Sequence, residues 1–332
     1  MEKLNHRDRL MTVLAGEKPD RFAVSFWRHF FDMEHHASGL MEAMVAFQKK
    51  FDWDFMKINP RADYHSEPWG LKLHFSYDSF EKHKKSNFPI RGIEDWEKIK
   101  PQPLDSPALA EHLYAVSLIR RAVGPELPLL MTVFSPLSVA GRLLENRNDL
   151  IEHLRQEPEL IESALEAITV TFVRFAEELR NAGADGLFFA TTHWASRTMI
   201  TWEEYRRFGT PFDLRVIEAA GEDAINLLHV CDPENYLKEL AEIDYHSRMY
   251  NWDADHPTNL PLDRAYDLLK GKAIVGGGDY TGWLLCARPD EAAAKIRSIM
   301  AAHDPSRLII GPGCAVLPAT PMENLRAVRE AI

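Results

Sequence analysis

The chain has 332 residues, of which 45% are hydrophobic and 27% are charged, and its formal net charge is −11. This length suits one large domain or two small ones, and the acidic balance argues against a general binder of nucleic acid or anionic membranes. No run approaches the roughly 18 apolar residues of a membrane span. The charged amphipathic N-terminal stretch has no signal-peptide core, and three cysteines cannot form an all-disulfide framework, so we expect a cytoplasmic protein.

Short apolar runs alternate with longer segments of helical periodicity, a pattern typical of parallel strands joined by helices. Eight runs are predicted strands: 22–26, 53–58, 128–134, 186–190, 224–230, 247–252, 272–276 and 307–310. Besides an N-terminal helix, predicted helices cover 149–181, 201–220, 233–243, 262–270, 289–303 and 321–332. This order predicts an α/β fold, a single (β/α)₈ TIM barrel that takes up residues 1–332.

The segment between the second and third predicted strands departs from this alternation. It runs from Asn59 to about Glu126, is rich in Pro, Lys and aromatic residues, and is too long for one helix. We expect it to form an excursion over one end of the barrel.

Barrel enzymes carry their chemistry on the loops that follow the carboxyl ends of the strands. His229 and Cys231 are two residues apart at the end of the fifth predicted strand, so both side chains point to the same face. Cys314 follows the eighth strand, 83 residues after Cys231. This nitrogen and sulfur set suits Zn²⁺, and three protein ligands leave a fourth position open for a substrate, which is typical of a catalytic site.

Three segments carry a family resemblance: Arg21-Phe-Ala-Val-Ser-Phe-Trp-Arg28, Phe134-Ser-Pro-Leu-Ser-Val-Ala140 and Gly313-Cys-Ala-Val-Leu-Pro-Ala-Thr-Pro321. In their order and spacing, the chain resembles the uroporphyrinogen decarboxylase superfamily over nearly its whole length. The resemblance implies a (β/α)₈ barrel with a deep cleft at the carboxyl ends of the strands.

The decarboxylase branch of that superfamily acts on a tetrapyrrole without a cofactor, and this chain departs from its pattern at four positions. Asn59 stands where the decarboxylases have their catalytic aspartate, and Cys314 stands where they have a late histidine. Asp32 replaces the second arginine of a pair that begins with Arg28, and Arg142 replaces a tyrosine. These departures make tetrapyrrole decarboxylation the weaker interpretation.

The other branch holds zinc methyltransferases that accept a methyl group from a methyl-corrinoid carrier protein, such as methylcobamide:coenzyme M methyltransferase. Their His-x-Cys and distant Cys motif matches His229, Cys231 and Cys314 one for one. The resemblance implies Zn²⁺ as cofactor, a corrinoid protein as partner, and a small methyl acceptor, either a thiol such as coenzyme M or tetrahydrofolate. Asp253 is the favoured fourth ligand in the resting state, with Asp255 and His256 as alternatives.

Other residues at predicted strand ends complete the candidate site. Arg28, His193 and Asp279 are candidate catalytic residues, and Asn59 and Ser135 are candidate cofactor-binding residues. Arg28 suits either an anionic substrate group or a structural ion pair, and His193 suits either substrate contact or a loop interaction. We expect His29, His35 and His36 to be mostly solvated, and Cys286 to lie in the core.

Three functional hypotheses follow. The first is a zinc methyltransferase that uses a corrinoid protein as donor. The second is a uroporphyrinogen decarboxylase, and the third is a non-catalytic barrel that binds a corrinoid or tetrapyrrole.

Overall fold

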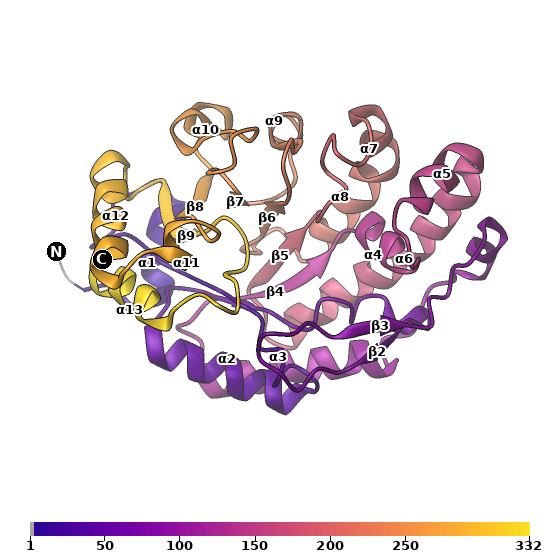
Figure 1. The fold of residues 1–332 in the computed structure, drawn as a ribbon, viewed down its shortest axis with the longest axis horizontal. Coiled ribbons are helices and arrows are strands. Elements are labelled where there is room, and N and C mark those ends of the chain that lie inside the picture. The colour runs from indigo at the N-terminus through magenta and orange to yellow at the C-terminus, as the bar shows by residue number, and fades with distance from the viewer. Residues whose placement is uncertain (1–2) are drawn as a thin grey trace.

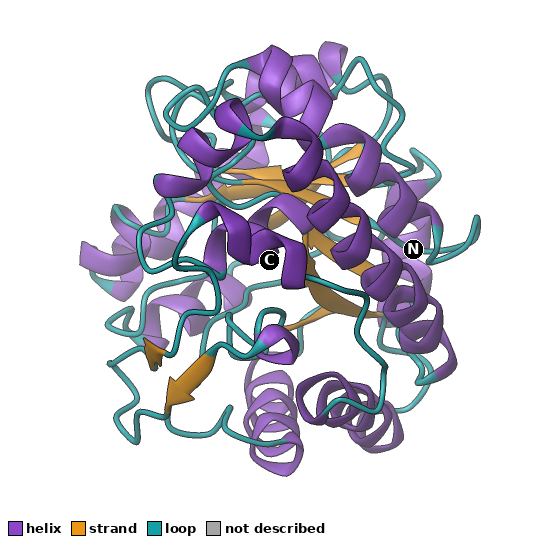
Figure 2. Ribbon diagram, turned by 90° about the vertical axis from the view of Figure 1, so that its right-hand side faces the viewer, coloured by secondary structure: helices purple, strands orange, loops and turns teal. Residues whose placement is uncertain are grey.

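The main sheet of the computed structural model, which describes residues 3–332, contains seven parallel strands. They follow the order β1-β4-β5-β6-β7-β8-β9 across a curled sheet that helices surround (Figures 1 and 2). Every residue of these strands is buried, as expected for parallel strands that are covered on both faces. The strands are β1 (Met56–Ile58), β4 (Leu129–Phe134), β5 (Gly186–Ala190), β6 (Leu227–Val230), β7 (Met249–Trp252), β8 (Ala273–Gly278) and β9 (Leu308–Pro312).

Helices connect and cover the strands. In the described part of the chain, no helix combines the length and the apolar character needed to cross a membrane. The helices are α1 (His6–Leu14), α2 (Ala37–Phe51), α3 (Pro107–Val123), α4 (Pro136–Arg142), α5 (Asp149–Gln156), α6 (Pro158–Asn181), α7 (Trp202–Phe208), α8 (Thr210–Glu218), α9 (Leu237–Leu240), α10 (Leu262–Leu268), α11 (Trp283–Cys286), α12 (Pro289–Ala302) and α13 (Met322–Glu330).

The predicted helices 149–181 and 201–220 are each split in two. Pro158 has no N–H to continue the hydrogen-bonding pattern of α5, so α6 begins at that proline. Gly209 separates α7 from α8, and Pro211 lies in the first turn of α8. The sequence periodicity showed the apolar faces correctly, but the breaks depend on these two prolines.

The first predicted strand, 22–26, was wrong as an extended strand: its ladder is reduced to one isolated bridge, between Val24 and Ile310. Ser25 N donates to Ile310 O, and Ile310 N donates to Ala23 O (2.9 and 2.8 Å). On the other side Asp54 N donates to Val24 O (2.7 Å), but the Val24 N–H is bound by the Asp54 carboxylate (2.8 Å). A side chain therefore takes the place of a ladder hydrogen bond.

The long segment between β1 and β4 contains a small hairpin apart from the main sheet (Figure 2). Strands β2 (Lys72–His74) and β3 (Lys84–Ser86) pair antiparallel, with short 3₁₀ helices η1 (Glu67–Trp69) and η2 (Ile93–Lys98) on either side. Helix α3 completes the segment and packs against α2.

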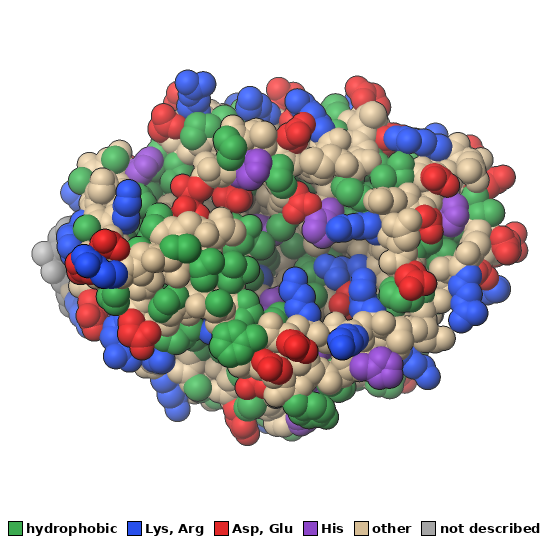
Figure 3. Space-filling view, viewed as in Figure 1, with side chains coloured by type: hydrophobic (Ala, Val, Ile, Leu, Met, Phe, Trp, Pro, Cys, Tyr) green, Lys and Arg blue, Asp and Glu red, His purple; other side chains and the backbone are tan. Residues whose placement is uncertain are grey.

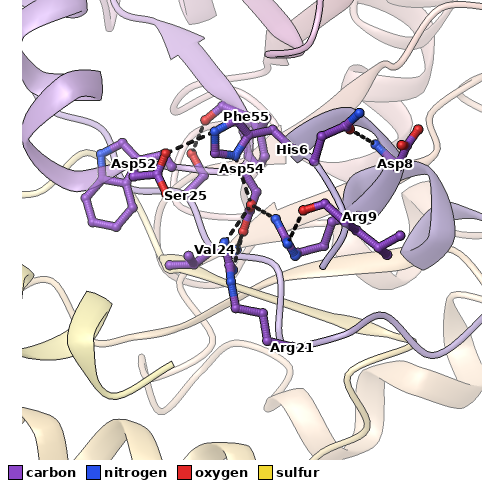
Figure 4. A network of polar contacts seen from close by, with 12 residues as sticks. His6, Asp8, Arg9, Arg21, Val24, Ser25, Asp52, Asp54 and Phe55 are labelled. Carbon is purple, nitrogen blue, oxygen red and sulfur yellow. Dashed lines mark hydrogen bonds and ion pairs between the residues drawn. The ribbon is translucent and has the colours of Figure 1, made fainter. Parts of the chain in front are cut away.

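Asp54 joins three separate parts of the N-terminal region (Figure 4). The fully buried carboxylate accepts from Arg9 Nη1 (2.7 Å) and from Arg21 Nη1 (2.7 Å). Burial alone would raise the pKa of Asp54, but hydrogen bonds from His6 and Arg21, and the charges of both arginines, lower it below its ordinary value. The carboxylate thus fixes α1 and the segment of Val24 beside β1.

We predict that Asp54→Asn lowers the free energy of unfolding by about 3–5 kcal/mol, because it removes a buried carboxylate that pairs with two arginines and leaves the buried Arg9 with Asp20 alone. Asp52→Asn is the matched control: Asp52 is exposed and also pairs with His6 and with Arg329. We expect it to cost no more than about 1 kcal/mol. Urea unfolding followed by tryptophan fluorescence measures both changes, and equal losses would contradict the role given to Asp54.

Candidate metal centre

The structure brings His229, Cys231 and Cys314 together. Their candidate ligand atoms all lie within 4.8 Å of one another. His229 Nε2 is 2.9 Å from Cys231 Sγ, and the two sulfurs are 3.8 Å apart. His229 lies on β6 and Cys231 directly follows it, whereas Cys314 lies just beyond the end of β9. The curl of the sheet from β6 to β9 thus brings together Cys231 and Cys314, which are 83 positions apart in the sequence.

Asn251 orients the histidine. On β7, this fully buried residue is the register partner of His229, and its Oδ1 lies 2.6 Å from His229 Nδ1. The Asn251 amide nitrogen donates to Val275 O (2.8 Å) and Pro312 O (2.9 Å), so the remaining oxygen only accepts. The proton of His229 therefore lies on Nδ1, and the lone pair of Nε2 points toward the sulfurs.

Sequence reasoning missed Asn251. The signal was present, because an asparagine lies in the middle of an otherwise apolar strand and in register with a candidate ligand. A hydrogen-bond acceptor behind a histidine ligand is a common feature of metal sites.

The contact between the two thiols shifts their pKa values in opposite directions. A hydrogen bond from Cys231, together with the charge of Lys57, holds the pKa of Cys314 well below its ordinary value. The same contact with Cys314, aided by burial, raises the pKa of Cys231. This arrangement favours one thiolate before any cation binds, which is the charge that a metal cation attracts.

Lys57 places a buried cation near these sulfurs, and it too was missed. Its side chain lies over the ring of Phe188, with Nζ 4.3 Å from the ring centroid, and it donates to Asn59 Oδ1. Burial lowers the pKa of Lys57 to about 8, although the charges of Cys314, Cys231 and Glu34 oppose that shift. A lysine inside the apolar β1 segment was the available sequence signal.

A cavity of about 510 Å³ opens over the three candidate ligands. Figure 3 shows the hollow near the centre of the molecular face, with basic side chains along its right and lower side and acidic ones at its upper left. Lys57, Thr132, Phe188 and Ala190 of the sheet form part of its wall, and Lys82, His83 and Lys85 of the hairpin region form another part. The segment 59–126 thus contributes directly to the site.

The other predicted residues occupy varied positions. His193 lines the cavity and contacts Asp232. Asp253 lies outside the three-ligand cluster, and its Oδ1 accepts from Asp255 N (3.3 Å).

The remaining candidates make contacts with the backbone or with neighbouring side chains. Arg28 donates to the backbone of His29 and Pro318 (3.2 and 3.5 Å). Asp279 accepts from Gly282 N at the start of α11 (2.7 Å), and Ser135 caps α4 and contacts Ser138 Oγ (2.6 Å). Asn59 is buried against Lys57.

Two expectations about side-chain environment were wrong. His29 lines the cavity and contacts the buried Glu34 (3.1 Å), and His35 is buried, because the loop that carries them folds against the hairpin region. His36, in contrast, is exposed as expected. His83 Nε2 lies 3.6 Å from Glu34 Oε1, and both residues line the cavity. Cys286, in the short helix α11, is exposed rather than part of the core.

Comparison with known proteins finds relatives of two kinds. A methylcobamide:CoM methyltransferase MtbA of Methanosarcina acetivorans is 24% identical over 242 residues, 73% of this chain and 68% of that protein. A uroporphyrinogen decarboxylase of Gloeobacter violaceus is 25% identical over 259 residues, 74% of this chain and 70% of its own length. At this level of identity, the relatives of the chain therefore include both methyltransferases and decarboxylases.

The solved structures show the fold. A methyltransferase from Methanosarcina mazei has a TM-score of 0.78 at 18% identity, and the match covers 99% of this chain and 98% of that one. A B12-independent methionine synthase from Shewanella has a TM-score of 0.55 at 14% identity, with 93% and 96% covered. Residues 5–332 match the family described as uroporphyrinogen decarboxylase (URO-D), so the chain belongs to that family.

Proposed function

We propose that this chain is a zinc-dependent methyltransferase that moves a methyl group from a methyl-corrinoid protein to a small thiol. The observation that carries the proposal is the set His229, Cys231 and Cys314, with Asn251 fixing the tautomer that leaves Nε2 free. Methyltransferases that act on methylcobamide and CoM are among the relatives of the chain, which supports the same reaction class.

The residues fit a zinc ion. Two sulfurs and one imidazole nitrogen are donors that zinc prefers, and Asn251 supplies the supporting hydrogen bond. When bound, zinc holds the acceptor thiol as a thiolate, the nucleophilic form.

The protein residues provide the remaining conditions for the transfer. Lys57 adds a positive charge beside the cysteine thiolates, and the apolar ring of Phe188 shields that charge from water. The cavity is open at the surface, so the donor is able to approach from the outside while the acceptor lies within (Figure 3). Tetrahydrofolate remains the alternative acceptor.

Asp253 remains our candidate for a fourth ligand in the absence of acceptor. It follows β7, which lies between the strands that carry Cys231 and Cys314, and it packs closely against Gly313. A carboxylate is a weaker ligand for zinc than a thiolate and is suited to leave when the acceptor binds.

Decarboxylation of a tetrapyrrole has less support. The position that carries the catalytic aspartate in that branch holds Asn59, whose oxygen is bound to Lys57. An amide there supplies no carboxylate to bind pyrrole N–H groups. Arg142, at the tyrosine position, is paired with Asp63 (2.6 Å).

The first prediction of this proposal concerns the sulfur ligands. We expect purified protein to hold about one zinc ion per chain, and Cys231→Ser and Cys314→Ser to lose it, because a hydroxyl does not replace a thiolate on zinc. Methyl transfer from methylcobalamin to 2-mercaptoethanesulfonate should fall by at least about 100-fold in both variants. Metal analysis and a spectrophotometric assay of the corrinoid measure the two effects.

Cys286→Ser is the matched control, since Cys286 is an exposed cysteine outside the cluster. It should keep both zinc and activity. Stoichiometric zinc in Cys231→Ser would remove the basis of the proposal.

The second prediction concerns Asn251. Asn251→Ala frees the imidazole to rotate and to change tautomer, so we expect the zinc dissociation constant to rise about 10- to 100-fold. Competition with a chelator measures the constant. Asn324→Ala is the control, because Asn324 is also fully buried and donates to two backbone carbonyls away from the metal centre. If Asn324→Ala weakened zinc equally, the effect would be one of general stability.

A further inference from the structure

An imidazole and a carboxylate form a pair on the wall of the metal cavity, in the loop that precedes α2. The backbone turns at Phe30, whose carbonyl accepts from Met33 N and Glu34 N (both 2.8 Å). This turn brings the Glu34 carboxylate back to His29, so that Nδ1 of His29 lies 3.1 Å from both carboxylate oxygens. Phe30 N donates to the same carboxylate (3.0 Å), and the backbone thus helps to hold the pair.

Glu34 is an anion although its side chain has no exposed area. Burial alone would raise the pKa of Glu34, but the charge and hydrogen bond of His29, the N–H of Phe30 and the charge of His83 lower it below its ordinary value. A carboxylate only accepts hydrogen bonds, so the proton of the His29 imidazole lies on Nδ1. The lone pair of His29 is then on Nε2, and no group of residues 3–332 donates to it.

His83 faces the same carboxylate from the hairpin region. Its Nδ1 accepts from Ser76 N (3.1 Å), so its own proton lies on Nε2, 3.6 Å from Glu34 Oε1. Burial lowers the pKa of His83, although the charge of Glu34 opposes this shift. Both nitrogens of His83 are therefore occupied, and His29 is the imidazole of the two that keeps a free lone pair.

The loop of His29 is bound to the segment that follows Cys314. Val316, two residues after Cys314, donates its N–H to the carbonyl of Trp27, two residues before His29 (3.0 Å). His29 and Glu34 line the same cavity as the three candidate metal ligands. A small molecule at the metal centre is therefore within the space that the pair borders.

Positive charges surround the pair. Arg28 adjoins His29 in the chain, Lys82 of the hairpin region lines the same cavity, and the charge of Glu34 acts on Lys57 of β1. Glu34 is the anion among these neighbours, so it is the group that stabilises an added proton on His29. A thiolate at the metal centre would add a second negative charge to the cavity and favour that proton further.

We propose that His29, oriented by Glu34, accepts the proton that the methyl acceptor thiol loses as it binds at the metal centre. This inference rests on the proposed function and adds the residue that receives the proton. The S–H bond breaks, its electron pair stays on sulfur, and the proton forms a bond to Nε2 of His29. The imidazolium pairs with the Glu34 carboxylate, and the proton passes to water after the methylated product has left.

Two other groups on the cavity are able to bind a proton. Burial lowers the pKa of Lys57 to about 8, so near neutral pH its amine is already protonated. His193 contacts Asp232, but their side chains are 40% and 27% exposed, whereas Glu34 has no exposed area. Water reaches the His193 pair more readily and exchanges protons with it directly, so we assign the proton to His29.

The experiment counts protons as 2-mercaptoethanol binds to the zinc-loaded protein, without a methyl donor. Calorimetric titrations at about pH 7, in buffers of different ionisation enthalpy, give the number of protons released per thiol. A free alkyl thiol is still protonated at this pH. We expect wild-type protein to release almost none, because His29 keeps the proton, and His29→Gln to release about one.

The pH profile of binding gives a second readout. Because His29→Gln releases a proton, its affinity for 2-mercaptoethanol should rise about tenfold per pH unit between about pH 7 and 8. The wild-type affinity should stay nearly level, so the two should converge as the pH rises. A structural role for His29 would instead lower the affinity by the same factor at every pH.

Glu34→Gln should behave like His29→Gln, because an amide nitrogen donates to Nδ1 and moves the imidazole proton to Nε2. His36→Gln is the matched control: His36 belongs to the same loop, is exposed, and is not among the residues that line the cavity. It should keep the wild-type proton count and pH profile.

The outcomes separate the two proposals. Release of about one proton by the wild type, or equal counts and parallel pH profiles in wild type and His29→Gln, would overturn the assignment of His29 while the methyltransferase proposal stands. A changed count in His193→Gln but not in His29→Gln would overturn it in favour of His193. If no thiol binds the zinc-loaded wild type at any pH, the thiol methyltransferase proposal itself fails.

Discussion

The metal centre depends on one buried amide. Asn251 lies on β7, yet its side chain binds His229 on β6 and the backbone carbonyls of Val275 on β8 and Pro312 on β9. Four adjacent strands are therefore joined by one side chain, and the carbonyl of Pro312 is only two residues from Cys314. Because these contacts are satisfied together, the imidazole cannot turn without breaking hydrogen bonds in a buried site. His229 and Cys314 are far apart in the sequence, and these contacts thus fix their relative position before any cation binds.

Lys57 keeps its positive charge because its partner at position 59 is an amide. An aspartate at position 59 would neutralise Lys57 directly, whereas the amide oxygen of Asn59 accepts a hydrogen bond and leaves the charge in place. That charge then acts on Cys314, whose pKa it helps to lower. The amide at 59 therefore leaves a buried cation close to the cysteine at 314.

The sequence predicted the parts of the site that depend on local periodicity. The spacing of His229 and Cys231 placed both on one face of a strand, and the parallel order of strands placed Cys314 near them. It did not predict the reduced first strand, because the Asp54 side chain that replaces a ladder bond comes from 30 residues further along the chain. Asn251 and Lys57 each stood out as a polar residue in an apolar strand, but their roles were missed because those roles follow from contacts between strands. The burial of Glu34 beside His29 and His83 likewise depends on tertiary contacts.

Charges of opposite sign lie on the two sides of the cavity. Acidic residues after β7 and β8 face basic residues from β3 and α4 across the opening (Figure 3). The net charge of −11 makes this basic wall a local exception on an acidic protein. In a partly enclosed space, such a field orients a small charged molecule more strongly than it would in open water.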